Sequence, residues 1–378
     1  MIYADNAATT RLSPHALEVM TDVARNTWGN PSSLYELGQR AQEALSDARS
    51  RMAALLGADA KEIYFTSGGS EGDNQAIRSC ARLGAAKNKR HIISTAFEHH
   101  AVLHTLKRLE KEGYEVTYLP VHENGIVTAD EVKAAIRPDT CLVTIMFANN
   151  EIGTIQPIRE IGAVCQAAKV PFHTDAVQAA GHIRIDVKEM NIDLLSLSAH
   201  KFHGPRGVGA AYIRKGVSVS PLITGGEQEK HRRAGTENVA GIVAMAEALQ
   251  ERVEEMEEEQ ERLKALSDRL IDGVLSAVTD CQLTGHRMER LPSIVSFLFE
   301  GVSPDELLAL LDMQGVAASA GSACTAGSNE PSHVLQAMGL IDGRRCAPLR
   351  LSMGRCTTEA EIDRVLEILP QTVARLRG

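Results

Sequence analysis

The chain has 378 residues, 44% hydrophobic and 24% charged, a composition typical of a globular protein too long for one ordinary core. Forty Lys and Arg against 49 Asp and Glu give a net charge of −9, which opposes tight binding to a nucleic-acid backbone. Only 4% of the residues are aromatic, so little surface is available for stacking on single-stranded bases.

The N-terminus and the cysteines indicate the compartment. Residues 1–6 contain no basic segment followed by an apolar one, and apolar stretches such as 141–148 are too short to span a bilayer. The seven cysteines are an odd number, are spread along the chain and form no C-x-x-C pair. This pattern fits a reducing cytoplasm and disfavours both a disulfide framework and a four-thiolate zinc site. We therefore expect a cytoplasmic protein that binds no membrane.

Five short apolar runs between residues 62 and 213 predict the strands of a sheet. They cover residues 62–66, 91–95, 141–147, 170–174 and 193–197, and each is followed by a polar or Gly-rich turn. Runs this apolar are typical of strands buried on both faces, and the helical stretches between them predict a mostly parallel α/β sheet. Because such sheets bind ligands at the carboxyl ends of their strands, the chemistry is expected in these turns.

After residue 237 the alternation of strands and turns gives way to a helical pattern. Residues 239–275 predict one long helix, and its acidic run 254–261 is interpreted as a solvated side joining two domains, with a partner-docking face as the alternative. From about residue 291, shorter α and β pieces follow, and the chain ends in an amphipathic helix at 359–376. These pieces predict a smaller α+β domain.

The turns after the first three strands carry polar clusters. Residues 67–74 are small and open a helix, so their backbone N–H groups predict a site for a cofactor monophosphate, although a Gly-rich helix cap fits as well. His99 in the next turn is suited to stacking on a ring or to proton transfer. The turn 149–153 would point amide groups into the cleft.

The last two turns supply a carboxylate and an amine. Asp175 is suited to holding the protonated nitrogen of a pyridinium ring, and a helix N-cap is its alternative role. Lys201 lies among small residues after a buried strand, which favours a Schiff-base amine over a solvated surface lysine. In chain order the turns provide a phosphate cradle, a ring-stacking imidazole, a pyridinium partner and a Schiff-base lysine. Together they predict an enzyme that uses pyridoxal 5′-phosphate (PLP).

Two other cofactor motifs are weaker. His100 and His104 have the i, i+4 spacing of metal ligands, but the sequence has no H-E-x-x-H motif and no clear third ligand, so no metal site is predicted. The glycines of 204–209 only loosely resemble a dinucleotide fingerprint, and they precede the strand-like run 208–213 instead of following one.

Cys324 lies in the middle of a run of small residues, 317–331. Such a segment has little side-chain mass to anchor it, so the thiol is expected to reach into a cleft and out again. A buried core cysteine is the alternative, and it fits Cys141, within a predicted strand, better than Cys324. We therefore predict that Cys324 is a nucleophile.

The ordered motifs resemble those of cysteine desulfurases of the NifS/IscS kind, fold-type-I PLP enzymes of the class-V aminotransferase family. The similarity runs over nearly the whole chain, and the long loop around Cys324 resembles the subgroup with an extended cysteine loop. The matching segments are residues 5–10, 29–33, 66–74, 149–151, 173–178, 200–201, 233–238 and 322–334.

The resemblance implies a fold and a set of residue roles. The fold is a large PLP-binding domain, 14–255, and a small domain, 1–13 with 256–378, that carries the Cys324 loop. Lys201 would form the Schiff base with PLP, Asp175 would pair with the pyridine nitrogen, and His99 would stack on the ring and transfer protons. The other implied cofactor-binding residues are Gly69, Ser70, Asn150, Gln178, Ser198, His200 and, from the second subunit of a homodimer, Thr236. The implied substrate-binding residues are Arg350, Asn150 and Asn6.

The implied activity is conversion of L-cysteine to L-alanine, with the sulfur held as a persulfide on Cys324. The sulfur acceptor would be a protein, either an iron–sulfur scaffold or a tRNA-thiolating enzyme. One alternative is a PLP-dependent cysteine or selenocysteine lyase, which Cys324 disfavours because β-elimination needs no protein thiol. The other is a non-catalytic sulfur carrier, which Lys201, Asp175 and Arg350 disfavour.

Overall fold

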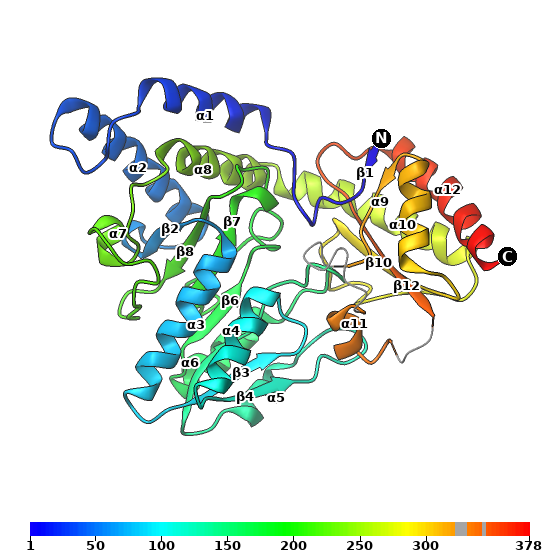
Figure 1. The fold of residues 1–378 in the computed structure, drawn as a ribbon, viewed down its shortest axis with the longest axis horizontal. Coiled ribbons are helices and arrows are strands. Elements are labelled where there is room, and N and C mark those ends of the chain that lie inside the picture. Colours follow the sequence, from blue (N-terminus) through cyan, green and yellow to red (C-terminus); the bar gives the residue numbers. More distant parts are fainter. Residues whose placement is uncertain (322–330, 342–344) are drawn as a thin grey trace.

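The computed structural model describes residues 1–321, 331–341 and 345–378, and its larger part is built on a seven-stranded sheet (Figure 1). From one edge to the other, the strands are β2 (Ile63–Thr66), β8 (Gly209–Ile213), β7 (Leu194–Ser198), β6 (Phe172–Asp175), β5 (Thr140–Thr144), β3 (His91–Thr95) and β4 (Glu115–Leu119). Only β8 runs antiparallel to its neighbours. The predicted mostly parallel sheet is therefore confirmed.

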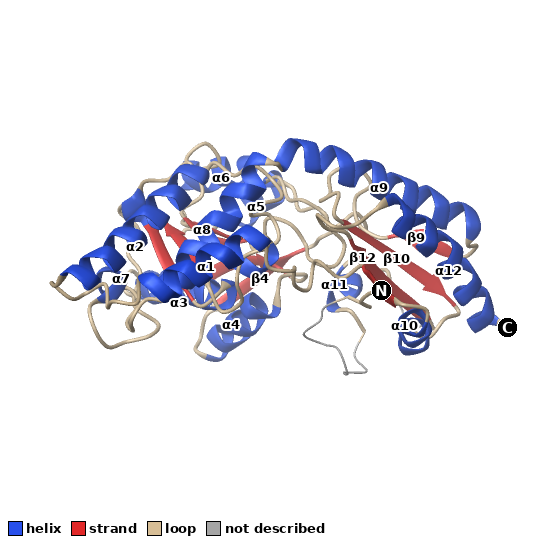
Figure 2. Ribbon diagram, turned by 90° about the horizontal axis from the view of Figure 1, so that it is seen from above, coloured by secondary structure: helices blue, strands red, loops and turns tan. Residues whose placement is uncertain are grey.

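Both faces of this sheet are covered by helices. Helices α3 (Gly69–Ala85) and α4 (His100–Lys111) lie on one face, and α5 (Ala129–Ala135) and α6 (Ile158–Ala168) on the other (Figure 2). Neighbouring strand residues alternate between two hydrophobic clusters; Leu194, for example, belongs to one and Leu195 to the other. This period of two explains why the strands read as continuous apolar runs. The remaining elements of this part are α1 (Pro14–Asn26), α2 (Glu36–Leu55), η1 (Ala60–Glu62), η2 (Ala199–Lys201), α7 (Gln228–His231) and α8 (Val239–Glu254).

The five predicted runs all form strands. The run 91–95 matches β3 residue for residue, and the ends of the other four are shifted by up to three residues. The run predicted at 141–147, for example, pairs only over β5, Thr140–Thr144. Strand β4 was missed, because it lies at the sheet edge and its partly exposed residues give no apolar run.

The C-terminal part has its own antiparallel sheet, as predicted for a smaller α+β unit. Its strand order is β12 (Cys346–Ser352), β10 (Ile294–Glu300) and β9 (Cys281–Leu283). A separate hydrophobic cluster joins it to helices α9 (Met256–Ala277), α10 (Pro304–Met313) and α12 (Glu359–Arg377). The chain start belongs here too, since β1 (Ile2–Tyr3) pairs with β11 (Val316–Ala317). Helix α11 (His333–Ala337) follows residue 331. Among the described residues, no helix combines the length and apolar character needed to cross a membrane.

The single helix predicted at 239–275 is wrong, because the chain breaks at Glu255 into α8 and α9. The apolar face of α8 packs in the core of the large sheet and that of α9 in the core of the small one, so the two helices need different directions. The acidic run is also only partly solvated. Glu259 is 8% exposed and its carboxylate lies 2.9 Å from Arg262 and 3.6 Å from Arg252.

His173 in β6 predicts how folding stability depends on pH. The ring is fully buried between the hydroxyls of Thr144 and Ser196, and burial lowers the pKa of His173 from 6.5 to about 3. Between these values the unfolded chain binds a proton that the folded chain excludes. Stability should therefore fall as the pH falls, by about 1.4 kcal/mol per pH unit for this residue.

Urea unfolding between about pH 6 and pH 4 measures this slope. His173→Asn should reduce the slope of the unfolding free energy against pH by about 1.4 kcal/mol per pH unit, the value for one bound proton. Asn in place of the exposed His231 is the matched control. An equal slope in the wild type and in His173→Asn would contradict the prediction.

Candidate active site

The carboxyl ends of β2, β3, β5, β6 and β7 meet at one edge of the large sheet, because these strands run in the same direction. A cavity of about 250 Å³ lies there, beside the small sheet. Its lining residues are Ala7, Ala8, Gly69, Ser70, Asp73, His99, Met146, Asn150, Asp175, Val177, Gln178, Ser198, His200, Lys201 and Arg350. The fold thus brings together all the predicted site residues except Asn6, Thr236 and Cys324.

One end of the cavity is formed by the N-terminus of α3. Gly69 is required there, because a Cβ on it would lie 2.3 Å from Cγ2 of Val177. Because Gly68 and Gly69 carry no side chain, the first backbone N–H groups of α3 are open to an anion, and the positive end of the helix dipole faces it. Ser198 and His200 line the same cavity from the end of β7. Burial and the nearby Lys201 lower the pKa of His200 to about 4, so its ring is neutral at neutral pH.

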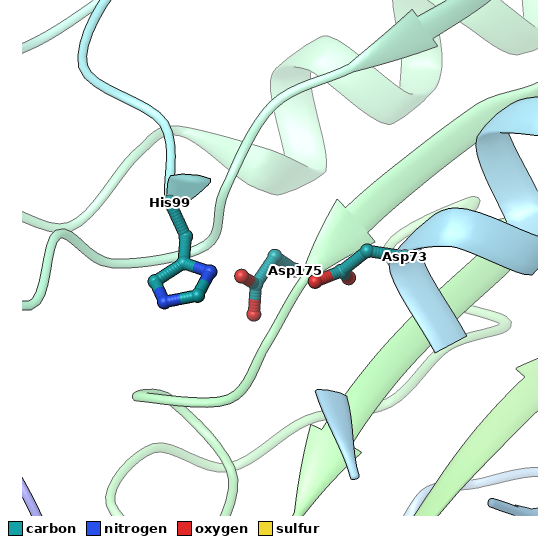
Figure 3. Close-up of side chains that lie close together, drawn as sticks. All are labelled: Asp73, His99 and Asp175. Atoms are coloured by element: carbon teal, nitrogen blue, oxygen red, sulfur yellow. The ribbon is translucent and has the colours of Figure 1, made fainter. Parts of the chain in front are cut away.

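Asp175 and His99 face each other across the cavity (Figure 3). Asp175 is 5% exposed, and its Oδ1 accepts a hydrogen bond of 2.9 Å from the backbone N–H of Val177. Burial raises the pKa of Asp175, while His99 and Lys201 oppose that rise. The Nδ1 of His99 caps α4 by accepting from the N–H of Ala101 at 3.1 Å, which leaves Nε2 to carry the ring proton.

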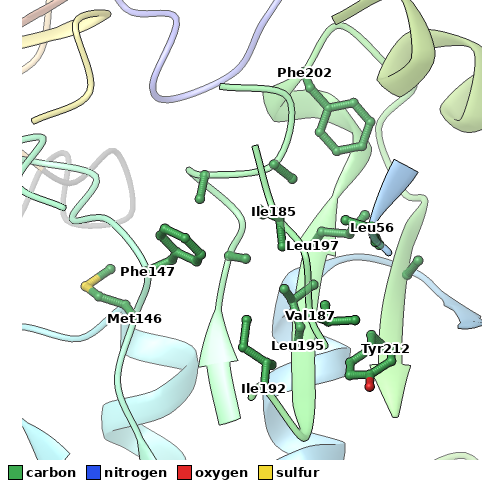
Figure 4. Close-up of a cluster of buried hydrophobic side chains, with 14 of the residues drawn as sticks. Leu56, Met146, Phe147, Ile185, Val187, Ile192, Leu195, Leu197, Phe202 and Tyr212 are labelled. Carbon is green, nitrogen blue, oxygen red and sulfur yellow. The ribbon is translucent and has the colours of Figure 1, made fainter. Parts of the chain in front are cut away.

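Lys201 lies in the short η2 turn directly after β7. Its Nζ donates to the carbonyls of Ala7 at 2.5 Å and Ala8 at 2.8 Å. The next residue, Phe202, is fully buried in the hydrophobic cluster of the large sheet (Figure 4). Phe202 packs closely on Gly181: a Cβ added to Gly181 would lie only 2.7 Å from the Cβ of Phe202. The buried ring therefore fixes the turn, and the amine projects into the cavity.

Arg350 reaches the cavity from β12 of the small sheet and is only 1% exposed. Its Nη2 lies 2.6 Å from Asp5, and its Nη1 donates to the carbonyl of Asn150 at 2.9 Å. The Nε is buried and makes no hydrogen bond to the described residues. A buried guanidinium with one N–H group that is not yet hydrogen-bonded is suited to binding a small carboxylate.

Cys324 lies outside the described residues, but the chain on either side of residues 322–330 adjoins the cavity. The Oγ of Ser332 donates to Glu151 at 2.6 Å, and Gly321 packs on the same carboxylate. Glu151 directly follows Asn150, which lines the cavity. The segment that carries Cys324 therefore begins and ends next to the site.

Two predicted residues lie elsewhere in this chain. Thr236 is exposed and does not line the cavity. Asn6 lines a neighbouring cavity, where its Nδ2 donates to the carbonyls of Tyr3 and Ser352. Its contacts in this chain are with the backbone of the small sheet region.

Sequence reasoning missed Asp73 and Met146, which also line the cavity. Helical spacing offers a signal for Asp73, because it lies four residues after Gly69 on the same face of α3. A third histidine lies near His100 and His104, the pair that has the spacing of metal ligands: the ring of His333 is 4.6 Å from that of His100. However, Nε2 of His333 is bonded to the carbonyl of Glu98, so this contact ties α11 to the large sheet.

The cavity fits PLP on its own evidence. It offers a glycine-lined anion cradle, a buried carboxylate for a ring cation and a lysine amine for a Schiff base, and the turns that carry them converge. A buried arginine beside the amine adds a place for an amino acid carboxylate.

Known proteins agree with this assignment. A family model of class-V aminotransferases matches residues 2–365. Cysteine desulfurase IscS of Methanosarcina thermophila is 52% identical over 377 residues, which cover 100% of this chain and 93% of that protein. A protein of the same name from Clostridium botulinum is 50% identical over 378 residues, with 100% and 95% covered.

Two solved structures share the fold. A NifS-like protein has a TM-score of 0.92 at 37% identity, over 99% of this chain and 100% of its own. A structure of SspA in complex with cysteine has a TM-score of 0.81 at 37% identity, over 93% and 99% of the two chains. The chain therefore belongs to the class-V aminotransferase family of PLP enzymes, among the cysteine desulfurases of the NifS/IscS kind.

Proposed function

We propose that this PLP-dependent cysteine desulfurase converts L-cysteine to L-alanine with Lys201, His99 and Arg350 acting on the substrate, and that Cys324 takes the sulfur. The observation that carries the proposal is that the Lys201 amine and the buried Arg350 guanidinium line one cavity, together with Asp175 at the end of β6. An amine and a guanidinium that line one cavity of about 250 Å³ suit a small amino acid substrate.

The residues that would hold the cofactor come from both ends of the cavity. The N-terminus of α3, with Gly69 and Ser70, and the side chains of Ser198 and His200 would bind the phosphate. Asp175 would hold the pyridine nitrogen, His99 would cover the ring, and Gln178 would lie by the ring hydroxyl. When bound, PLP withdraws electrons from the substrate through its protonated ring.

Arg350 would orient the cysteine by its carboxylate, with Asn150 adjacent to the substrate. Asp5 and the carbonyl of Asn150 hold two edges of the guanidinium, so only a limited set of directions is open to the carboxylate. Lys201 Nζ is the base that takes the proton from the substrate Cα, and His99 Nε2 is placed to pass a proton within the cavity.

Cys324 would complete the reaction as a nucleophile. Its thiolate attacks the sulfur of the substrate, an S–S bond forms, and the Cβ–S bond breaks. The electron pair of that bond and a proton remain with the three-carbon product, which leaves as alanine, while the enzyme keeps a persulfide. The contacts of Ser332 and Gly321 with Glu151 support this role, since Glu151 directly follows the cavity-lining residue Asn150.

The partners and the compartment are part of the proposal. Thr236 is exposed in a single chain, which fits a role in the phosphate site of the partner subunit of a homodimer. The persulfide would pass to an acceptor protein, either an iron–sulfur scaffold or a tRNA-thiolating enzyme. We place the enzyme in the cytoplasm, where free thiols such as the six described cysteines persist.

We also propose that the chain divides into the domains 14–255 and 1–13 with 256–378. Two observations support this boundary: the break between α8 and α9 at Glu255, and a hydrophobic cluster that lies wholly within the second domain. The larger cluster extends across it through Leu298 and α11.

The first test is a product assay on purified enzyme with L-cysteine and a thiol reductant. Alanine and sulfide should form in equal amounts without pyruvate, and Cys324→Ser should bind cysteine but release no alanine. The buried Cys141→Ser is the matched control and should retain alanine formation. Pyruvate in place of alanine would indicate β-elimination, and full activity of Cys324→Ser would refute the persulfide step.

Lys201→Ala should prevent covalent attachment of the cofactor. The visible absorbance of the bound cofactor should change to that of free PLP, and alanine formation should fall by more than about 10³-fold, because both the Schiff base and the Cα base are lost. Absorbance spectra before and after gel filtration measure the attachment. A wild-type spectrum in Lys201→Ala would assign the cofactor to another amine.

Asp5→Asn should weaken substrate binding, because the neutral amide no longer holds Nη2 of Arg350 by charge. The KM for cysteine should rise about tenfold with a smaller change in kcat. Asp363→Asn breaks an exposed Asp–Arg pair, to Arg269 at 2.5 Å, and is the control. Equal KM values for the two variants would contradict a role of Asp5 in orienting Arg350.

A further inference from the structure

Asp73 is a buried acid in the cavity whose charge no part of the proposed mechanism uses. It lies near the start of α3, is 1% exposed, and points toward Asp175 (Figure 3). One side-chain atom each from Asp73, Asp175 and His99 lies within 4.8 Å of the other two. Neither carboxylate oxygen of Asp73 makes a hydrogen bond of normal length to the described residues.

An imidazole ring, a hydroxyl and further acids surround Asp73. The nearest ring is that of His173, with Nε2 at 3.6 Å from Oδ1 of Asp73, and burial lowers the pKa of His173 to about 3, so that ring is neutral. Ser196 of β7 offers a hydroxyl, and Glu98 after β3 is a second buried acid whose pKa burial raises to about 8. Burial raises the pKa of Asp73, and the neighbouring Asp175 and Glu98 raise it further, whereas the Ser196 hydroxyl opposes the rise.

Asp175 is better able to carry a negative charge than Asp73. It accepts the backbone hydrogen bond from Val177, and His99 and Lys201 both lower its pKa. Two carboxylates this close together in a buried site do not both ionise. The proton goes to the carboxylate that has fewer hydrogen-bond donors and positive groups around it.

We propose that Asp73 is a positioning residue that holds a proton in the resting enzyme, so that the Asp73–Asp175 pair presents one negative charge to the cofactor. A single carboxylate balances the single charge of a pyridinium. An ionised Asp73 would add a second negative charge to the cofactor site and would raise the pKa of a Schiff base on Lys201. This inference rests on the proposed cofactor site, and it deepens the account of that site.

Infrared spectroscopy measures the protonation of Asp73 directly. The difference spectrum of wild type minus Asp73→Asn, recorded near neutral pH with ¹³C-labelled aspartate, should contain the C=O stretch of a carboxylic acid. Asp193→Asn is the control and should remove a carboxylate band, because Asp193 pairs with Arg214 at 2.9 Å. Loss of a carboxylate band in Asp73→Asn would overturn the proposal.

The holoenzyme gives a second measurement, the pH titration of the visible cofactor band. Asn mimics a neutral acid, so the midpoint for Asp73→Asn should lie within about 0.3 pH unit of the wild-type value. If Asp73 were ionised, removal of its charge would lower the midpoint by about one unit or more, and the proposal would be wrong. Asp73→Leu, a second neutral variant, should give the same midpoint if Asp73→Asn does not fold.

The two proposals fail in different ways. The infrared measurement is repeated on apoenzyme, where a carboxylic acid band again supports a protonated Asp73 and a carboxylate band overturns it, whatever the cofactor does. An error in the cofactor site would show instead as a visible band that Lys201→Ala leaves unchanged.

Discussion

Every strand that leads into the active site is buried on both faces, and this constraint places the chemistry. Burial on both sides disfavours charged side chains along these strands, so the functional groups of the large sheet collect where its strands end. Arg350, which projects from within β12 of the small sheet, is the exception among the site residues. Because β2, β3, β5, β6 and β7 run in the same direction, their ends meet at one edge. Asp175 and Lys201 come together in space for this reason.

The N-terminal segment joins this edge to the small sheet. Strand β1 pairs with β11, and a few residues later the carbonyls of Ala7 and Ala8 accept from Lys201. Asp5, between them, holds Arg350 from β12. A short stretch of chain thus contacts both the amine and the guanidinium, and any movement of the small sheet relative to the large one would change the distance between them.

The site is built around buried acids and neutral imidazoles, a combination that suits a cationic ring. Burial keeps His173 and His200 uncharged, so they contribute hydrogen bonds without repelling a pyridinium. Asp175 has partners that stabilise its charge, whereas the Asp73 oxygens make no hydrogen bond of normal length to the described residues and burial raises the pKa of Glu98 to about 8. The electrostatic character of the cavity therefore depends on which of several carboxyl groups is ionised.

The sequence by itself determined the fold class and the chemistry of the strand ends, because buried strands and their polar turns are local patterns. Residue type and position after a strand predict Lys201, Asp175 and His99 as site residues, and its small neighbours predict Cys324 as the nucleophile. Only the tertiary structure decided the break at Glu255, since the two halves of that helical pattern serve different cores. It also decided the pairing of Asp5 with Arg350 and the approach of Asp73 to Asp175. These contacts join residues far apart in the chain, and no spacing in the sequence encodes a distance that arises when separate elements pack.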